Sequence, residues 1–197
     1  KFELTSKYGY KSSSNWYYSG MFSFKSQFDK GYKYNNDAGT KTEISKFMAP
    51  AYMFVSIGMD YKPNDKFTLL LSPITGKSTF VLDDSLSQSG AFGVDPGKNI
   101  RNEVGGFVKI AYNNEILKNV TLSSKLELFA SYLEEPQNVD INWELLISMK
   151  INEYLSANIN TQVIYDDDIK YIDKNGTEHG PRIQFKEVFG VGLSYKF

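Results

Sequence analysis

The last nine residues of the chain constrain its fold more than any other stretch, because they alternate strictly in polarity. The odd-numbered positions are all apolar and mostly aromatic: Phe189, Val191, Leu193, Tyr195 and Phe197. The positions between them are glycine, serine and lysine. Successive side chains of a strand point to opposite faces, so one face here is apolar and the other polar. Such a pattern is typical of a strand that lies between lipid and a polar lumen.

Eight earlier segments alternate in the same way, which makes nine predicted strands. They begin at Phe2, Trp16, Met53, Phe67, Val104, Val120, Ile141 and Leu155. Most are roughly ten residues long, the length that a tilted strand needs to cross the hydrocarbon layer; the one at Phe67 ends by Leu71. A soluble sandwich or a lipocalin-like barrel also alternates, but its apolar face points inward and needs no aromatic ends. We therefore predict an all-β, antiparallel, up-and-down transmembrane β-barrel.

The composition agrees with this fold and argues against membrane-spanning helices, nucleic-acid binding, disulfides and thiolate metal sites. Aromatic residues make up 15% of the 197 residues, more than a soluble core of this size requires. No apolar run approaches the ~18 residues of a membrane-spanning helix. The formal net charge of −1 gives no basic field for nucleic acid, and the absence of cysteine excludes disulfides and thiolate metal sites. Residues 1–197 are predicted to form a single domain with no cofactor.

The connections between strands predict an orientation. Short links are expected around residues 12–14, 63–65, 113–119 and 153–154, and the opposite links are 30–49, 74–101, 133–140 and 166–182. Short periplasmic turns and long outer loops are usual for such barrels, so we expect a periplasmic C-terminus. An aromatic girdle is expected at the periplasmic ends: Tyr10, Trp16, Tyr18, Tyr61, Tyr112 and Tyr195.

An odd number of strands leaves one edge without a partner. Intact single-chain barrels of this kind have an even number of strands, and open edges in lipid are costly. We therefore expect an N-terminally incomplete barrel, with one or three strands missing before Lys1. Otherwise a separate partner protein must pair with the edges.

The closing strand resembles the signal that directs insertion of bacterial outer-membrane β-barrels. Other stretches are similar to a Bacteroidota family of uncharacterised outer-membrane β-barrel proteins, a domain-of-unknown-function family. These stretches are Leu4–Lys11 (LTSKYGYK), Asn15–Tyr18, Gln27–Phe28, Gly31–Tyr32, Phe47–Tyr52 (FMAPAY), Gly58–Pro63 (GMDYKP), Leu71–Lys77 (LSPITGK), Gly90–Gly93, Tyr165–Ile169 (YDDDI) and Gln184–Phe197 (QFKEVFGVGLSYKF). The resemblance implies an outer-membrane location, contact with lipid, insertion by the barrel-assembly machinery and twelve strands in all. It supplies no catalytic residues.

The polar strand faces supply the candidate lumen residues, and these carry both signs of charge: Lys25, Asp60, Glu103, Lys109, Lys125, Glu127, Glu144 and Lys150. A pore selective for one charge is expected to carry a ring of one sign. Two hypotheses remain: a weakly selective aqueous pore, and an interior filled by salt bridges and amide hydrogen bonds. The Ile74 to Arg101 segment is long for a passive link. It is predicted to be a constriction or a partner contact, or simply to pack on other loops, and its candidate residues are Lys77, Phe80, Phe92, Lys98 and Arg101.

Two further groups are weaker candidates for chemistry. Asp166, Asp167 and Asp168 could offer oxygen ligands to Ca²⁺, but adjoining acids do not follow the EF-hand spacing and fit a solvated loop better. His179 is the only histidine and could serve a hydrolase at the barrel rim, but nothing in the sequence orients it. We therefore expect no enzymatic activity. The leading hypothesis is a porin or small-solute transporter, followed by an accessory subunit that docks partners, and then by a rim hydrolase.

Overall fold

The computed structural model describes residues 2–35, 39–133, 135–172 and 178–193, which form one large antiparallel sheet and short additional elements. The nine strands of the sheet are β1 (Phe2–Lys11), β2 (Trp16–Ser26), β5 (Ala51–Asn64), β6 (Phe67–Phe80), β7 (Ile100–Leu117), β8 (Val120–Ser131), β9 (Asp140–Lys150), β10 (Leu155–Tyr165) and β13 (Gln184–Leu193). Each pairs with the strand before and after it in this order, so the topology is up-and-down. The predicted all-β class and the set of nine strands are confirmed.

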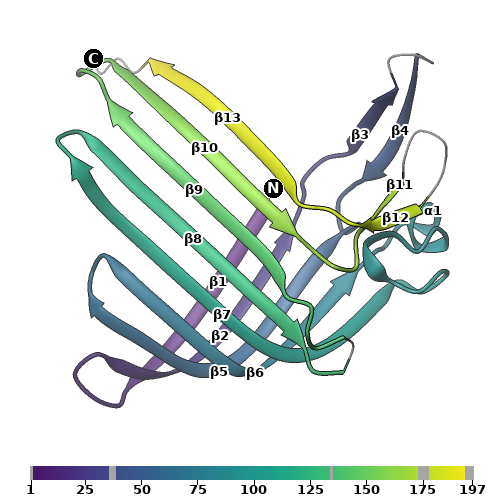
Figure 1. Ribbon diagram of the computed structural model, residues 1–197, viewed down its shortest axis with the longest axis horizontal. Helices are drawn as coiled ribbons and strands as arrows, with labels where there is room; N and C mark the ends of the chain where they lie inside the picture. The colour runs from purple at the N-terminus through teal and green to yellow at the C-terminus, as the bar shows by residue number, and fades with distance from the viewer. Residues whose placement is uncertain (1, 36–38, 134, 173–177, 194–197) are drawn as a thin grey trace.

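The sheet curls strongly but is not closed. In the described part of the chain, β1 pairs only with β2, and β13 pairs only with β10. Figure 1 shows β1 and β2 behind β7, β8 and β9, and the Glu3 side chain of β1 lies 2.7 Å from that of Lys125 in β8. The sheet is therefore a deep trough whose concave face brings distant strands together.

The two ends of the trough differ as the sequence predicts. At one end, which we call the turn end, strands are joined by residues 12–15, 65–66, 118–119 and 151–154. At the other, the loop end, the connections contain four further elements: the hairpin of β3 (Gly31–Asn35) and β4 (Thr40–Ser45), the helix α1 (Asp84–Gln88), the 3-10 turn η1 (Ala91–Gly93) and the hairpin of β11 (Lys170–Ile172) and β12 (Glu178–Pro181) (Figure 1). No helix in the described residues is long and apolar enough to cross a membrane.

The extents predicted for β6 and β7 were wrong. The strand predicted to end by Leu71 continues to Phe80, and β7 runs from Ile100 to Leu117, so the connecting loop covers only residues 81–99. The register shifts between Ser72 and Thr75, around Pro73, which has no N–H to donate. The hydroxyl of Tyr132 donates to the Pro73 carbonyl at 2.8 Å. Because of this shift, even-numbered residues face the concave side before Pro73 and odd-numbered residues face it from Thr75 on. Gly76 and Ser78 then lie on the convex face, so this part of β6 lacks large apolar side chains on both faces.

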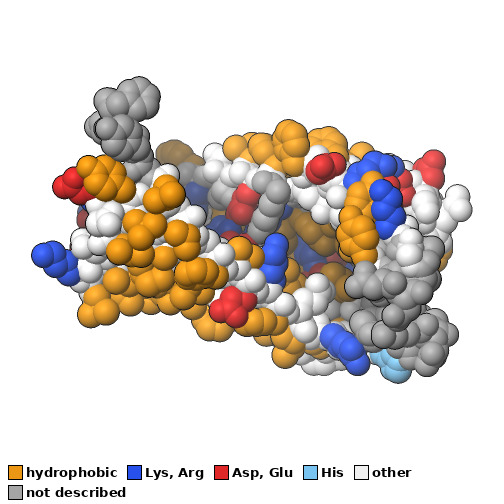
Figure 2. Space-filling view, turned by 90° about the horizontal axis from the view of Figure 1, so that it is seen from above, with side chains coloured by type: hydrophobic (Ala, Val, Ile, Leu, Met, Phe, Trp, Pro, Cys, Tyr) orange, Lys and Arg blue, Asp and Glu red, His pale blue; other side chains and the backbone are white. Residues whose placement is uncertain are grey.

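The two faces of the sheet have the polarity expected of a strand between lipid and a polar interior. Among the described residues, buried polar or charged side chains outnumber buried hydrophobic ones by 14 to 9. Large apolar side chains lie instead on the convex face, including Phe22, Val55, Ile57 and Val191, which are 38%, 49%, 64% and 61% exposed. Figure 2 shows charged side chains inside the hollow and hydrophobic ones around it. A water-soluble sheet would bury the opposite face.

Candidate functional site: the concave face of the sheet

Glu127 of β8 is the centre of a group of charged side chains in the middle of the concave face, the central ion-pair network. Its carboxylate contacts Lys25 Nζ from β2, accepts from Lys109 Nζ at 3.0 Å and lies 3.5 Å from Lys125 Nζ. Lys125 also binds Glu3 of β1 at 2.7 Å. Lys25 and Glu127 are almost fully buried, although three strands lie between β2 and β8 in the sheet. These ion pairs therefore bridge the trough from wall to wall.

Apolar side chains lie next to this network, midway between the turn end and the loop end. Met21, Leu70, Phe107 and Phe129 form a buried cluster on the concave face, with Phe54 packed against it. The Phe54 ring lies 5.6 Å from that of Phe107 and 6.2 Å from that of Phe129. The middle of the trough is consequently filled by side chains, which separates the space near the turns from the space near the loops.

A second charged group, the mouth network, lies at the loop end. Lys77 of β6 binds Asp140 of β9 at 2.6 Å and Glu103 of β7 at 3.3 Å. Arg101 of β7 binds Glu103 at 3.5 Å, pairs with Asp168 and donates to the Gly93 carbonyl at 3.2 Å. Arg101 thereby ties two loop connections to the sheet.

Gly93 is required for this contact. It has a positive φ of 73°, and a Cβ there would lie 2.4 Å from Arg101 Nη1 and 2.7 Å from Asp168 Cβ. Only glycine allows the loop backbone to approach Arg101 so closely.

Two hollows open on the concave face, one on each side of the central network. The turn-end hollow has a volume of about 380 Å³ and is lined by residues that include Thr68, Ser123, Lys125, Glu144 and Asn160. The loop-end hollow is larger, about 530 Å³. Its lining includes Tyr52, Phe54, Phe92, Phe107 and Phe129, with Lys25, Lys77, Glu127, Asp140 and Asp166.

The 81–99 loop packs against a neighbouring connection and also reaches the loop-end hollow. Val81 and Val94 form a buried cluster with Ala49, and Leu86 and Phe92 pack on it. Asp83 caps α1 by accepting from Leu86 N at 2.9 Å, and its hydrogen bond with Lys46 lowers the pKa of the Asp83 carboxyl. The loop is thus anchored, with Phe92 lining the hollow.

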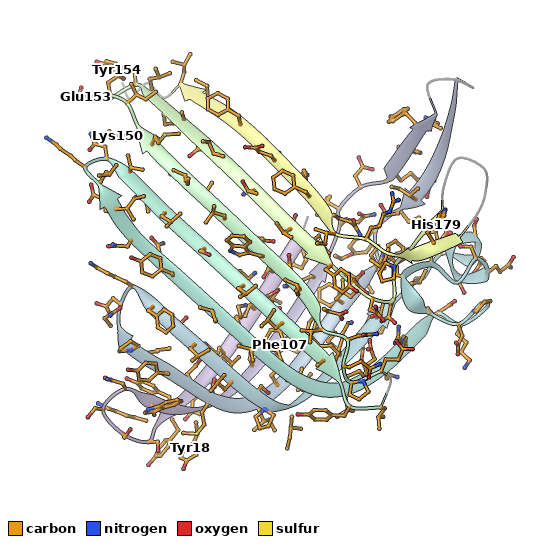
Figure 3. All side chains as sticks on the ribbon, in the orientation of Figure 1. Tyr18, Phe107, Lys150, Glu153, Tyr154 and His179 are labelled. Carbon is orange, nitrogen blue, oxygen red and sulfur yellow. The ribbon has the colours of Figure 1, made fainter. Side chains whose placement is uncertain are left out.

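Seven of the eight predicted lumen residues lie within the trough. Lys25, Lys109, Lys125 and Glu127 form the central network, Glu144 accepts from Gln162 at 3.2 Å, and Glu103 belongs to the mouth network. Asp60 is buried and binds Lys7 of β1 at 2.8 Å. Lys150 is exposed at the turn end (Figure 3).

The constriction-loop candidates do not all lie in a loop, which corrects the prediction. Lys77 and Phe80 belong to β6 and Arg101 to β7, because those strands are longer than predicted. Lys98 is exposed and binds Asp95 at 2.8 Å, and only Phe92 both lies in the loop and lines the hollow. Of the predicted insertion signal, Phe189, Val191 and Leu193 are exposed on the convex face. Tyr195 and Phe197 lie outside the described residues, so the prediction that Tyr195 belongs to the aromatic girdle lies outside them too.

Several residues of the site were not identified from the sequence. Phe107 and Phe129 have the same phase as their charged neighbours Lys109 and Glu127, so the alternation places them inward and could have revealed them. Asp140 was assigned to a loop boundary, but it begins β9 and binds Lys77. No pattern in the sequence predicts which charges meet across the trough.

The three consecutive aspartates do not converge on one point. Asp166 lines the loop-end hollow, Asp167 accepts from the Tyr165 hydroxyl at 3.3 Å, and Asp168 pairs with Arg101. Within the described ranges, no group of three or more histidine, cysteine or acidic residues is arranged to hold a metal ion. His179 is exposed in β12, opposite Tyr171 at the loop end (Figure 3), and the rim-hydrolase hypothesis stays a prediction.

Comparisons with known proteins give a short match to one family. The model of a family described as "Protein of unknown function (DUF3078)" matches residues 1–32, which cover β1, β2 and the start of β3. No curated protein and no solved structure matches the chain. The chain is thus similar, over its first two strands, to a family to which no function has been assigned.

Proposed function

We propose that the chain forms most of the wall of an outer-membrane β-barrel that transports small solutes, with its loops outside the cell and its turns in the periplasm. The inverted polarity of the sheet carries this proposal: the charged face is concave and buried, and the apolar face is convex and exposed. An exposed apolar surface of this extent is a lipid or protein contact surface. Further strands would close the barrel by pairing with β1 and β13, since open edges are not stable in lipid.

Details of the convex face support a lipid environment. Trp143 Nε1 donates to Ser124 Oγ at 3.0 Å, so two polar groups on this face satisfy each other, as lipid requires. At the turn end, Tyr10 pairs in register with Tyr18, and Trp16 with Tyr61. This row of amphipathic rings suits a membrane–water interface.

The filled centre of the trough supports a gated transporter over a permanently open porin. Solute moving between the two hollows would have to part the central ion-pair network. Glu127 holds Lys25 and Lys109, so its loss would leave neighbouring ammonium groups that repel one another. The wild-type network carries both signs of charge, so it gives little charge selectivity. In Glu127→Gln, Glu3 is the one acid of this network left to oppose Lys25, Lys109 and Lys125, so the opened passage of this variant would be positively charged.

Planar-bilayer conductance of the full-length protein tests this proposal. We expect rare, small openings for the wild type, and larger, anion-selective currents for Glu127→Gln. Lys98→Gln is the matched control, because Lys98 is exposed and pairs only with Asp95 among the described residues. The transport proposal fails if the wild type, Glu127→Gln and a variant lacking residues 81–99 are all silent.

A second candidate function is an accessory subunit of a membrane complex. Glu187 favours it, because this carboxylate lies on the convex face of edge strand β13, between Phe185 and Phe189. A charge at such a position is costly in lipid and would be better covered by protein. A photo-crosslinker at Phe189 should then capture a second protein in native membranes, whereas one at Trp143 should not. Capture of lipid alone at both positions would remove this candidate.

A further inference from the structure

The loop-end hollow combines an aromatic lining with an excess of acidic groups. Tyr52, Phe54, Phe92, Phe107 and Phe129 line it, and its volume of about 530 Å³ is in the range of small-molecule sites. Its charged lining consists of two lysines, Lys25 and Lys77, and three acids, Glu127, Asp140 and Asp166. The lining of the hollow is therefore largely aromatic, and its formal charge is negative.

Both lysines of the lining are already neutralised. Lys25 contacts Glu127, and Lys77 binds Asp140 and Glu103. An anionic ligand would have to displace these carboxylates. The hollow is consequently a poor site for an anion.

Asp166 is the acid that remains unneutralised. Among the described residues, no lysine, arginine or histidine forms an ion pair with its carboxylate. Within the described residues, this carboxylate accepts one hydrogen bond, from the backbone N–H of Asp168 at 3.0 Å. A neutral ligand would exclude water from this carboxylate and provide no compensating charge, which is unfavourable. A cationic ligand would provide it.

Two aromatic rings of the hollow already contact lysine ammonium groups. Lys25 Nζ lies 5.9 Å from the centre of the Phe54 ring, and Lys77 Nζ lies 4.9 Å from that of Phe129. Both distances are within the range of cation–π attraction, which is stronger where water is excluded. The surroundings of Asp166 thus favour positive charge through ring faces as well as through carboxylates.

We propose that the loop-end hollow binds an organic cation with an apolar body, whose charged group lies at Asp166 and whose body packs on the aromatic lining. This names the class of solute for the proposed transporter and so rests on that proposal. Phe92, which the 81–99 loop brings to the hollow, contacts the bound cation from the loop side. The central network forms the inner limit of the site.

Calorimetric titration of the full-length protein in a non-ionic detergent tests the inference without requiring transport. The probes are benzyltrimethylammonium, the neutral 2-methyl-1-phenylpropan-2-ol and the anion benzenesulfonate. We expect the cation to bind at least about tenfold more tightly than either of the others. Asp166→Asn should remove most of this advantage, whereas Asp95→Asn, an exposed acid of the 81–99 loop, should leave it unchanged.

A second variant covers the case in which Asp166→Asn does not fold. Phe92→Leu keeps the apolar contact but removes the ring, so it should weaken binding of the cation and leave binding of the neutral probe unchanged. The inference is overturned if the wild type binds the anion or the neutral probe as tightly as the cation, or if both folded variants retain the cation preference. Cation binding without any flux in reconstituted vesicles would contradict the transport proposal and leave the site intact.

Discussion

Two carboxylates of the concave face, buried Glu127 and partly buried Asp166, differ in how they are neutralised. Glu127 contacts three lysines from β2, β7 and β8, so its charge is balanced where it lies. Asp166, just beyond β10, faces Lys77 but also Asp140 and Asp168. Burial and these neighbouring acids raise the pKa of Asp166 to about 6, although Lys77 opposes the increase. One residue therefore holds the network together, while the other disfavours its own charged form.

The raised pKa of the Asp166 carboxyl should be visible in the pH dependence of the unfolding free energy. An acid with a higher pKa in the folded protein holds its proton more tightly there. Its contribution to stability is therefore greatest below the reference pKa of 3.8, decreases as the pH rises towards 6 and is constant above about 7. Relative to Asp166→Asn, the wild type should lose about 2 kcal/mol of unfolding free energy between pH 4 and pH 7.

Urea unfolding in lipid vesicles at several pH values measures this difference. The groups facing Asp166 are Asp140 of β9, Lys77 of β6 and Asp168 of its own loop, and none of them is altered in the variant. Asp95→Asn is the control, because Lys98 lowers the pKa of Asp95 and any effect has the opposite sign. Parallel pH profiles for the wild type and Asp166→Asn would contradict the assignment.

The pairing of β5 with β6 depends on a glycine at an irregular point of the ladder. The register shifts between Ile57 and Met59, and a Cβ on Gly58 would lie 2.0 Å from the Leu71 carbonyl oxygen and 2.6 Å from Ser72 Cα. Both contacts are with backbone, which cannot move away cheaply.

Gly58→Ala should therefore lower the unfolding free energy by about 1–3 kcal/mol. Gly20→Ala and Gly76→Ala are matched controls in β2 and β6, since a Cβ at either position has no atom within 4 Å. Equal unfolding midpoints in urea for all three variants would show that the bulge is not as tight as described.

At the level of elements, alternation alone predicted the nine sheet strands and the contrast between short turns and long loops. It failed where both faces of a strand are polar, as in β6 beyond Pro73. The β3–β4 and β11–β12 hairpins were missed within predicted loops. These segments carry little apolar periodicity because neither face needs to contact lipid or a core.

For a related reason, the sequence predicted which residues face the concave side of the candidate site but not which of them contact one another. A period of two assigns Lys25, Lys109 and Glu127 to the same face, but it says nothing about which strand lies opposite which. That Lys25 of β2 meets Glu127 of β8 depends on how far the sheet curls. Curvature arises from twist, bulges and packing along the whole sheet, which no single segment encodes.

The whole molecule is a trough with a charged interior and an apolar exterior, bridged at its centre and anchored by loops at one end. This arrangement accounts for the exposed convex face, the row of aromatic rings at the turn end and the buried ion pairs through a single cause. In the proposed membrane location, lipid would replace the apolar core that a soluble protein would supply.

Depth-dependent quenching of tryptophan by brominated lipids tests this central claim most directly, because the chain has only two tryptophans. Trp143 lies within the apolar convex band, and the Trp16 ring packs against that of Tyr61 at the turn end, 4.8 Å between ring centres. In full-length protein in vesicles, with any tryptophan outside residues 1–197 replaced by phenylalanine, Trp143 of the Trp16→Phe variant should be quenched most by lipids brominated along the acyl chain. Trp16 of the Trp143→Phe variant should be quenched most by lipids brominated close to the headgroup. If bromolipids quench neither tryptophan, the convex face is not in contact with lipid and the account is wrong.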